Sequence, residues 1–231
     1  MFYTLETSQK TILNLVAEEY PKLYLVGGTA ISLLYHHRIS EDLDFFTQQY
    51  SSKLHREIAT VIKKELGFNF NLIEEEKRKK YIPMAVYEFE VGKNIILKVD
   101  FVNDYVKLLR ERQKNGIASI EDIYYRKILA AIGWKAKQSE TGQLLAGGRQ
   151  KTKDVYDIFF LSSNVERFNI FFSEHFDLNA YKRLSAWYLG IPRQKTIMEL
   201  LESVPGCDTR AVFTHLDNEI IRELNRRYVE I

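Results

Sequence analysis

The first half of the chain shows the period-two alternation of apolar and polar residues that is typical of β-strands. Between residues 82 and 91, aromatic and aliphatic residues alternate with Glu88 and Glu90, and an apolar run over residues 95–102 follows a Gly-Lys-Asn turn. Because successive side chains of a strand point to opposite faces, this period predicts a sheet with one face in the core. The predicted strands cover residues 23–26, 42–45, 68–73, 82–91 and 95–102.

After residue 117 the apolar residues recur three or four positions apart, which is the spacing of an α-helix. The helices predicted there cover residues 120–137, 152–161, 165–176, 180–189, 195–203 and 219–229, and those predicted earlier cover residues 29–35, 54–66 and 106–113. A mixed sheet followed by helices predicts an α+β fold. We expect two domains, with the sheet in residues 1–116 and a helical domain that completes the cleft in residues 117–231.

The composition is that of a globular protein, and it excludes several classes without selecting a function. The 231 residues are 45% hydrophobic and 28% charged, and no apolar run has the length of a membrane span or the character of an export signal. Cys207 is the single cysteine, which excludes an internal disulfide framework and a cysteine-based zinc site. These features predict a cytoplasmic protein with no membrane partner. A net charge of +2 is too small to indicate nucleic acid as a partner.

A strand, a glycine turn and a helix follow one another between residues 23 and 35. The apolar run ends abruptly at Gly27 and Gly28, and Thr29 opens the helical pattern. Glycine lets the backbone approach a ligand closely, and the N–H groups at a helix start favour an anion. The segment therefore predicts a phosphate-binding turn. The alternative is an ordinary tight turn, which is what most Gly-Gly pairs form.

Two carboxylates stand one residue apart shortly after this turn. In an extended strand Asp42 and Asp44 point to the same face, while Leu43 and Phe45 point into the core. Adjacent carboxylates repel each other unless a cation lies between them, and hard oxygen ligands suit Mg²⁺ or Mn²⁺. This spacing favours a metal site, and an exposed acidic strand end is the alternative.

Four segments of the chain resemble, in order, the motifs of the AbiEii/AbiGii-type nucleotidyltransferase toxins, which are part of the DNA polymerase β-like nucleotidyltransferase superfamily. The first segment contains Gly-Gly-Thr-Ala, then Arg38-x-Ser40, then Asp-Leu-Asp-Phe-Phe. The others are an apolar strand with Asp100, a helix with Lys127, and a Lys-Asp-x-x-Asp motif with Asp154 and Asp157. The resemblance covers residues 23–161.

The resemblance implies a metal-dependent nucleotidyltransferase that moves an NMP from an NTP to an acceptor hydroxyl and releases pyrophosphate. The implied ligands of the Mg²⁺ or Mn²⁺ ions are Asp42, Asp44 and Asp100. The implied nucleotide-binding residues are Gly27, Gly28, Thr29, Arg38, Ser40 and Lys127, and the implied catalytic residues are Asp42, Asp44, Asp100, Lys127, Asp154 and Asp157. Family membership also implies a toxin with a cognate antitoxin, with tRNA 3′ ends as the first acceptor class and a protein hydroxyl as the second.

Without the resemblance, the later residues have plainer interpretations. Asp100 is as often a strand-end turn residue as a ligand, Lys127 is a solvated lysine, and Asp154 complements the start of a helix. For the whole chain two alternatives stay open. One is transfer to a protein or to a small molecule such as an aminoglycoside, and the other is an inactive nucleotide-binding module with a regulatory role.

Basic and aromatic residues in the second half indicate where an RNA acceptor would bind. Arg193 and the pair Arg226 and Arg227 are candidates for phosphate contact, with Trp187, Tyr188 and Tyr228 as stacking surfaces. A small-molecule acceptor would not need these residues.

Overall fold

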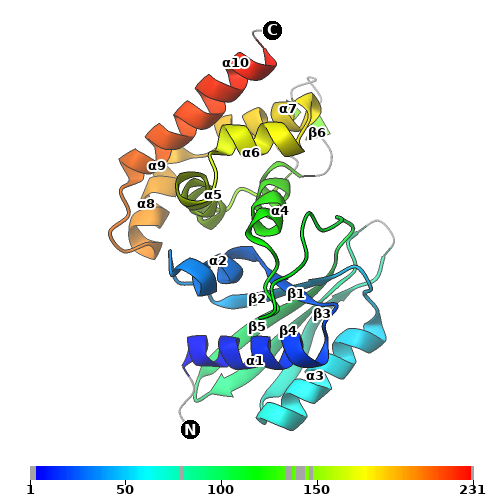
Figure 1. Ribbon diagram of the computed structural model, residues 1–231. Helices are drawn as coiled ribbons and strands as arrows, with labels where there is room; N and C mark the ends of the chain where they lie inside the picture. Colours follow the sequence, from blue (N-terminus) through cyan, green and yellow to red (C-terminus); the bar gives the residue numbers. More distant parts are fainter. Residues whose placement is uncertain (1–3, 79–80, 134–136, 139–143, 146–147, 230–231) are drawn as a thin grey trace. The chain divides into compact units, whose positions relative to one another are not determined.

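The computed structural model describes residues 4–78, 81–133, 137–138, 144–145 and 148–229 of the chain (Figure 1). The chain forms two compact units. The sheet unit comprises residues 1–36 and 40–123, and the helical unit comprises residues 37–39 and 124–231. The predicted division after residue 116 lies seven residues before the division between these units. The three residues 37–39 belong to the helical unit although their neighbours on both sides belong to the sheet unit.

The sheet unit contains a five-stranded mixed sheet with the strand order β1-β2-β5-β4-β3. β2 runs parallel to β5, and the other neighbouring pairs are antiparallel. The strands are β1 (Tyr24–Val26), β2 (Asp42–Thr47), β3 (Asn69–Glu76), β4 (Met84–Gly92) and β5 (Ile95–Asn103).

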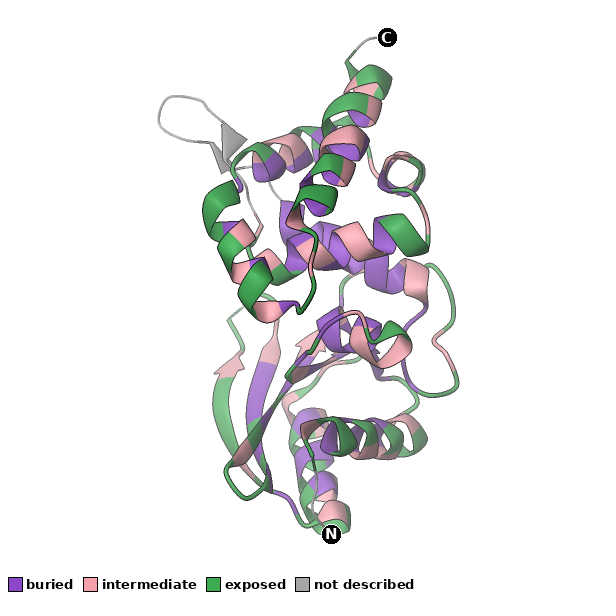
Figure 2. Ribbon diagram, turned by 90° about the vertical axis from the view of Figure 1, so that its left-hand side faces the viewer, coloured by how far each residue is buried: buried purple, intermediate pink, exposed green. Residues whose placement is uncertain are grey.

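One face of this sheet is apolar, and α1 (Leu5–Glu19) and α3 (Ser52–Leu66) lie along it (Figure 1). Leu43 and Phe45 of β2 are paired in register with Val99 and Phe101 of β5, and all four are buried. Figure 2 shows the buried residues concentrated on the sides of the strands and helices that face each other. Because side chains alternate along a strand, the remaining residues of β2 and β5 point to the opposite face.

Across that opposite face, neighbouring strands set two rows of residues side by side. Asp44 of β2 is paired with Asp100 of β5, and Asp42 is paired with Lys98, which in turn is paired with Glu88 of β4. α2 (Gly27–Tyr35) follows β1 directly and packs against β1 and β2. The sheet therefore gathers acidic side chains next to the start of α2.

The helical unit is built from short helices around an aromatic core. Tyr124, Phe168, Phe171, Phe172 and Trp187 are all fully buried. Its helices begin with α4 (Ile120–Ile132, of which residues from 124 onward belong here), α5 (Thr152–Asn164), α6 (Phe168–His175), α7 (Leu178–Leu189) and α8 (Arg193–Ser203). The last are α9 (Thr209–Leu216), the π-helix η1 (Asp217–Leu224) and α10 (Asn225–Tyr228), and the short strands β6 (Lys137–Gln138) and β7 (Leu144–Leu145) pair with each other.

The predicted α+β class is confirmed, and each of the five predicted strands is present with ends that shift by a few residues. The helix predicted at residues 106–113 is wrong, because carboxylates take the backbone amides of this segment. Asp104 accepts from the N–H of Val106, and Asp122 accepts from those of Leu109 and Arg110. The helix predicted at residues 120–137 ends at Ile132, and the sequence pattern predicts neither α1 nor α9.

Among the described residues, no helix combines the length and the apolar character that crossing a membrane requires.

Candidate functional site

The turn between β1 and α2 depends on Gly27, which adopts φ +83. A Cβ atom at this position would collide with the Oδ2 atom of Asp44, which lies against the glycine. Glycine is thus required twice, for a left-handed backbone conformation and for the close approach of a carboxylate. The turn predicted to approach a phosphate holds Asp44 at the start of α2.

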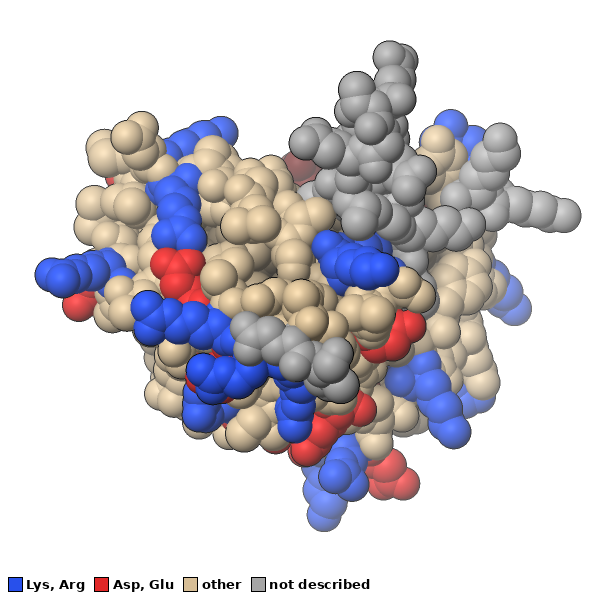
Figure 3. All heavy atoms as spheres, turned by 90° about the horizontal axis from the view of Figure 1, so that it is seen from above, with Lys and Arg blue, Asp and Glu red and all other residues tan. Residues whose placement is uncertain are grey.

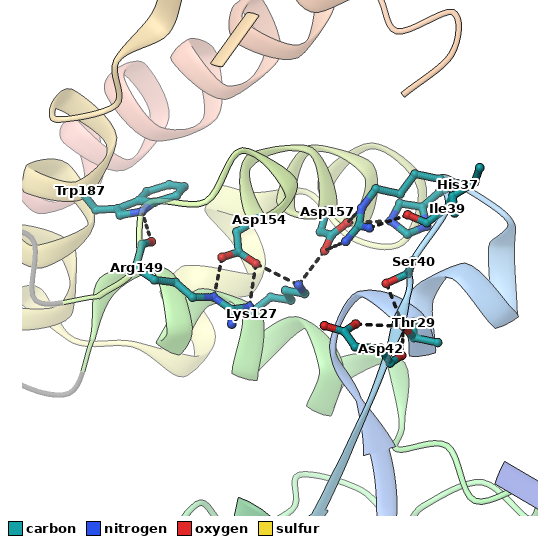
Figure 4. Close-up of polar contacts among 11 residues, drawn as sticks. Thr29, His37, Ile39, Ser40, Asp42, Lys127, Arg149, Asp154, Asp157 and Trp187 are labelled. Carbon is teal, nitrogen blue, oxygen red and sulfur yellow. Dashed lines mark hydrogen bonds and ion pairs between the residues drawn. The ribbon is translucent and has the colours of Figure 1, made fainter. Parts of the chain in front are cut away.

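Thr29 and Ser40, both predicted to bind nucleotide, brace the loop that leads into β2. The Thr29 hydroxyl is fully buried and hydrogen-bonds to Ser40 Oγ at 2.8 Å and to the backbone carbonyl of Asp42 (Figure 4). Gln9 of α1 donates to the Ser40 carbonyl at 2.9 Å. These bonds fix the entry of β2 and hence the position of Asp42.

Asp42, Asp44 and Asp100 share one face of the sheet with Lys98. The Lys98 ammonium donates to Asp100 Oδ2 at 2.8 Å, and the lysine side chain is 47% exposed. Burial alone would lower the pKa of Lys98, but the hydrogen bond to Asp100 and the charges of Asp100, Asp44 and Asp42 raise it. The charge of all three carboxylates therefore reaches one cation.

The donor atoms of this face suit a divalent cation of the kind that the family resemblance implies. Asp44 and Asp100 are carboxylates on directly paired strand positions, and hard oxygen ligands are what Mg²⁺ and Mn²⁺ prefer. Within the described part of the chain, no three His, Cys, Asp or Glu side chains are already gathered closely enough to hold an ion. The donor atoms of these residues fit a divalent cation, and the Lys98 ammonium, which binds the Oδ2 atom of Asp100, would compete with it.

In the helical unit, Lys127 of α4 lies between the two acids of α5. Its Nζ atom is 2.9 Å from Asp154 Oδ1 and 2.6 Å from Asp157 Oδ2 (Figure 4). Only 4% of the lysine side chain is exposed. Burial opposes the charged form, but Asp157 and Asp154 outweigh it and raise the pKa of Lys127. The interpretation of Lys127 as a solvated surface residue is therefore wrong.

Asp157 is fully buried and receives three basic groups. Besides Lys127, Arg38 Nε and Nη2 donate to its two oxygens at 2.7 and 2.8 Å, and His37 Nε2 lies 2.7 Å from Oδ1. Burial alone would raise the pKa of Asp157, but Lys127, His37 and Arg38 hold it well below its ordinary value. The predicted nucleotide ligand Arg38 therefore forms a two-point ion pair with α5, and its Nη1 donates to the Ile39 carbonyl.

Asp154 is bound in the same way by Lys127 and Arg149. Arg149 Nε and Nη2 donate to its two oxygens at 2.7 and 2.9 Å, and the Arg149 carbonyl accepts from Trp187 Nε1. Burial would raise the pKa of Asp154, but Lys127 and Arg149 lower it. Interpreting Asp154 as a simple helix-start charge misses these two partners.

The structure thus arranges the predicted residues in two sets. The sheet unit gathers Gly27, Gly28, Thr29, Ser40, Asp42, Asp44 and Asp100, and the helical unit gathers Arg38, Lys127, Asp154 and Asp157. Sequence reasoning missed Lys98, His37 and Arg149. Lys98 could have been found, because its spacing of two from Asp100 puts both on one strand face. No local signal distinguishes His37 or Arg149, whose partners lie far along the chain.

The predicted RNA contacts in the helical unit have different outcomes: Arg226 and Arg227 are exposed, whereas Arg193, Trp187 and Tyr188 are occupied or buried. Both terminal nitrogens of Arg193 bind Asp217, and its guanidinium stacks over the rings of Tyr188 and Phe213. Trp187 and Tyr188 are 0% and 1% exposed, so they cannot serve as stacking platforms. The stacking prediction is wrong for Trp187 and Tyr188, because both build the core, while Tyr228 is half-buried and stacks on Tyr181.

A comparison with protein families identifies the family to which most of the chain is similar. The sequence profile of the family described as "Nucleotidyl transferase AbiEii toxin, Type IV TA system" matches residues 14–202. No protein with a curated description matches the sequence.

Two of the solved structures that resemble this chain, both from Helicobacter pylori, share its fold. The protein JHP933 from Helicobacter pylori has a TM-score of 0.55 at 21% identity, with 98% of this chain and 92% of that chain covered. A putative nucleotidyltransferase from H. pylori has a TM-score of 0.51 at 22% identity, covering 97% and 94% of the two chains. MenT4, a nucleotidyltransferase toxin from Mycobacterium tuberculosis, has a TM-score of 0.46 at 17% identity, covering 77% and 63%.

Proposed function

Because the chain belongs to the AbiEii family of nucleotidyltransferase toxins from type IV toxin–antitoxin systems, we propose that it transfers an NMP from an NTP to a hydroxyl of RNA, with a divalent metal ion as cofactor. The family assignment covers the reaction class. The metal, the acceptor and the roles of individual residues are the parts proposed.

The observation that supports the proposal best is the carboxylate face beside the start of α2. The residue before α2, Val26, provides no side-chain cap, so the first N–H groups of the helix are not capped from that side. Uncapped helix N-termini bind phosphate well, because their N–H groups and the helix dipole favour an anion. The triphosphate would lie at this helix start, and Asp42, Asp44 and Asp100 would lie beside it.

Asp42, Asp44 and Asp100 would hold the metal. Bound there, Mg²⁺ or Mn²⁺ would supply charge neutralisation for the phosphoryl group that is transferred. The protein's own part is positioning: Gly27 admits the Asp44 carboxylate, and the Thr29 hydroxyl fixes the backbone at Asp42. The acceptor hydroxyl attacks the α-phosphorus, the bond to the bridging oxygen breaks, and pyrophosphate leaves.

Lys127 is the nucleotide-contacting lysine of the proposal. An ammonium group has three N–H donors, and Asp154 and Asp157 take two of them, which leaves one for a phosphate oxygen. The two acids keep Lys127 charged and fixed in direction. Asp154, Asp157, Arg38 and His37 are then positioning residues that act through Lys127.

A labelling experiment tests the function directly. The purified chain is incubated with each α-labelled NTP, Mg²⁺ and total RNA, alongside an Asp44→Asn variant as control. We expect label on RNA from the wild-type chain and none from the variant. Label confined to protein or to a small molecule would replace RNA as the acceptor, and no label on any acceptor would contradict catalysis. A type IV system also implies an antitoxin, whose presence should suppress the labelling in cells.

A further inference from the structure

The helical unit contains a cavity that the site described above does not use. Its volume is about 460 Å³, and it is lined by residues at the beginnings of α5 and α8 and by the segments that precede them. A cavity of this size falls in the range that holds small ligands or single nucleotide units.

Both helices that open onto the cavity begin without a capping side chain. Lys151 precedes α5 and Pro192 precedes α8, and neither makes a side-chain cap bond. Side chains cap the starts of α1, α3, α7 and α9, through Thr4, Ser51, Asp177 and Asp208, whereas α2 and α6 also begin without such a bond. A helix start without such a cap presents N–H groups that suit an anion.

Thr196 gives an independent sign of an absent ligand. It lines the cavity, it is only 3% exposed, and its hydroxyl makes no hydrogen bond with any described residue. The hydroxyl oxygen is not one of the fully enclosed polar atoms of the described residues, so it stays open to hydrogen bonding from the cavity that Thr196 lines. A polar ligand in the cavity would pair with this hydroxyl.

The charged residues around the cavity indicate what the ligand is. Lys151, Lys153 and Lys195 supply positive charge for a phosphate, and Lys195 forms an exposed ion pair with Glu199 at 3.6 Å. Two carboxylates line the same cavity: Glu199, which accepts from the Thr152 hydroxyl, and Glu202, which is exposed. Carboxylates repel phosphate but accept hydrogen bonds from sugar hydroxyls and base N–H groups. Lysines that can bind a phosphate lie beside glutamates that can accept a hydrogen bond from a hydroxyl. This combination suits an RNA strand better than a simple anion, because RNA carries a 2′-hydroxyl next to each phosphate.

We propose that this cavity binds one nucleotide unit of the acceptor RNA, with its phosphate at the starts of α5 and α8 and its ribose toward the glutamates. The inference rests on the proposed transfer to RNA. We assign the phosphate to the cavity and not to Arg193, because Arg193 is bound to Asp217.

The test measures binding of a short fluorescein-labelled single-stranded RNA, and of DNA of the same sequence, to the full chain. The first variant is Lys151→Gln with Lys195→Gln, and its matched control is Lys182→Gln with Arg210→Gln, which removes the same charge from exposed positions elsewhere in the unit. We expect the first variant to lose about tenfold in RNA affinity. Its salt slope should fall by about 0.7 per lost phosphate contact, whereas the control keeps the wild-type slope.

Thr196→Val separates ligand binding from folding. Because the hydroxyl has no partner in the protein, its loss should leave the unfolding temperature unchanged while lowering RNA affinity about threefold. Wild-type chain that labels RNA, together with cavity variants that bind RNA as tightly as the control, would overturn the cavity assignment alone. Wild-type chain that neither binds nor labels RNA would overturn the proposed acceptor and the cavity together. Equal affinity for RNA and DNA, or displacement of RNA by inorganic phosphate at matching concentration, would overturn the ribose contact.

Discussion

The acidic residues of the two units differ in burial and in ion pairing. On the sheet, Asp42, Asp44 and Asp100 share a face with one lysine whose side chain is half exposed. In the helical unit, Asp154 and Asp157 are 1% and 0% exposed and are bound by Lys127, Arg38, Arg149 and His37. Each of these two acids of the helical unit is bound by at least two basic groups, while on the sheet the Lys98 ammonium binds Asp100.

This difference separates two uses of the same side chain. Carboxylates that gather on one face with little compensating charge repel each other in the free protein, and a divalent cation relieves that repulsion. Carboxylates that are buried and matched with cations are already satisfied, and losing one leaves buried charge unpaired. We infer that the acids of β2 and β5 serve chemistry, while the acids of α5 serve to hold Lys127.

The mixed charge of the surface fits this division. On the face seen from above in Figure 3, Lys and Arg side chains stand among scattered Asp and Glu rather than forming one broad basic area. With a net charge of +2, the chain has no strong overall field for nucleic acid. Local sites therefore have to carry the recognition of nucleotide and RNA.

The largest expected effect is on catalysis at the sheet face. Asp44→Asn should lower the rate of nucleotide transfer by roughly a thousandfold or more, because a metal-binding carboxylate is lost. Glu88→Gln is the matched control, since Glu88 is an exposed acid of β4 paired with Lys98 and we assign it no ligand role. Single-turnover rates with α-labelled NTP make the comparison. A folded Asp44→Asn variant with the rate of Glu88→Gln would contradict the account.

The next effect is on stability in the helical unit. Asp157→Asn should lower the free energy of unfolding by about 3–5 kcal/mol, because the buried charges of Lys127 and Arg38 would lose the carboxylate that both of them bind. Asp44→Asn, in contrast, should lower the free energy of unfolding by less than about 1 kcal/mol, or should raise it. Urea unfolding followed by circular dichroism measures both. Similar losses for the two variants would remove the distinction between the units.

Acid should lower the stability of the helical unit through Asp154 and Asp157. The folded-state pKa values of Asp154 and Asp157 are lowered, so the stability that these acids contribute is present above their unfolded pKa, at about pH 4. It is lost as the pH falls below that value toward the folded pKa, at up to about 1.4 kcal/mol per pH unit and group. The stability curves of wild type and Asp157→Asn should therefore converge in acid. Curves that stay parallel below pH 4 would show that the folded-state pKa of Asp157 is not lowered.

A smaller effect is expected at Lys98. Its ammonium competes with a divalent cation for Asp100, so Lys98→Met should tighten Mn²⁺ binding by about fivefold, which corresponds to roughly 1 kcal/mol at a solvated site. Lys93→Met in the exposed turn before β5 is the control. Calorimetric titration with Mn²⁺ in the absence of NTP reports the affinity. Weaker binding in Lys98→Met would mean that the lysine assists the metal instead of competing with it.

The sequence was most informative where function follows from short-range spacing. Alternation of Tyr87, Phe89 and Val91 with glutamates predicts β4, and the spacing of Asp42 and Asp44 predicts their common face, which the structure shows. Spacing cannot reveal a partner far along the chain. Arg38 has the position of a nucleotide ligand in its motif, yet it pairs with Asp157, which is 119 residues away.

Burial was the second property that local patterns could not supply. Trp187 and Tyr188 look like stacking surfaces beside basic residues, but packing of α7 places both in the core. Lys127 looks like a solvated lysine on an apolar helix, but α5 covers it with two acids. In each case the neighbouring helix decides the role, and its approach depends on tertiary packing rather than on the local sequence.

Metal binding to paired variants tests the central claim most directly. Wild type, Asp44→Asn and Asp154→Asn are titrated with Mn²⁺ by calorimetry under conditions in which all three are folded. If the sheet acids are the ligands and the α5 acids hold Lys127, Asp44→Asn should lose at least about tenfold in Mn²⁺ affinity while Asp154→Asn keeps the wild-type value. Unchanged Mn²⁺ affinity in Asp44→Asn, with a loss in Asp154→Asn, would contradict the account.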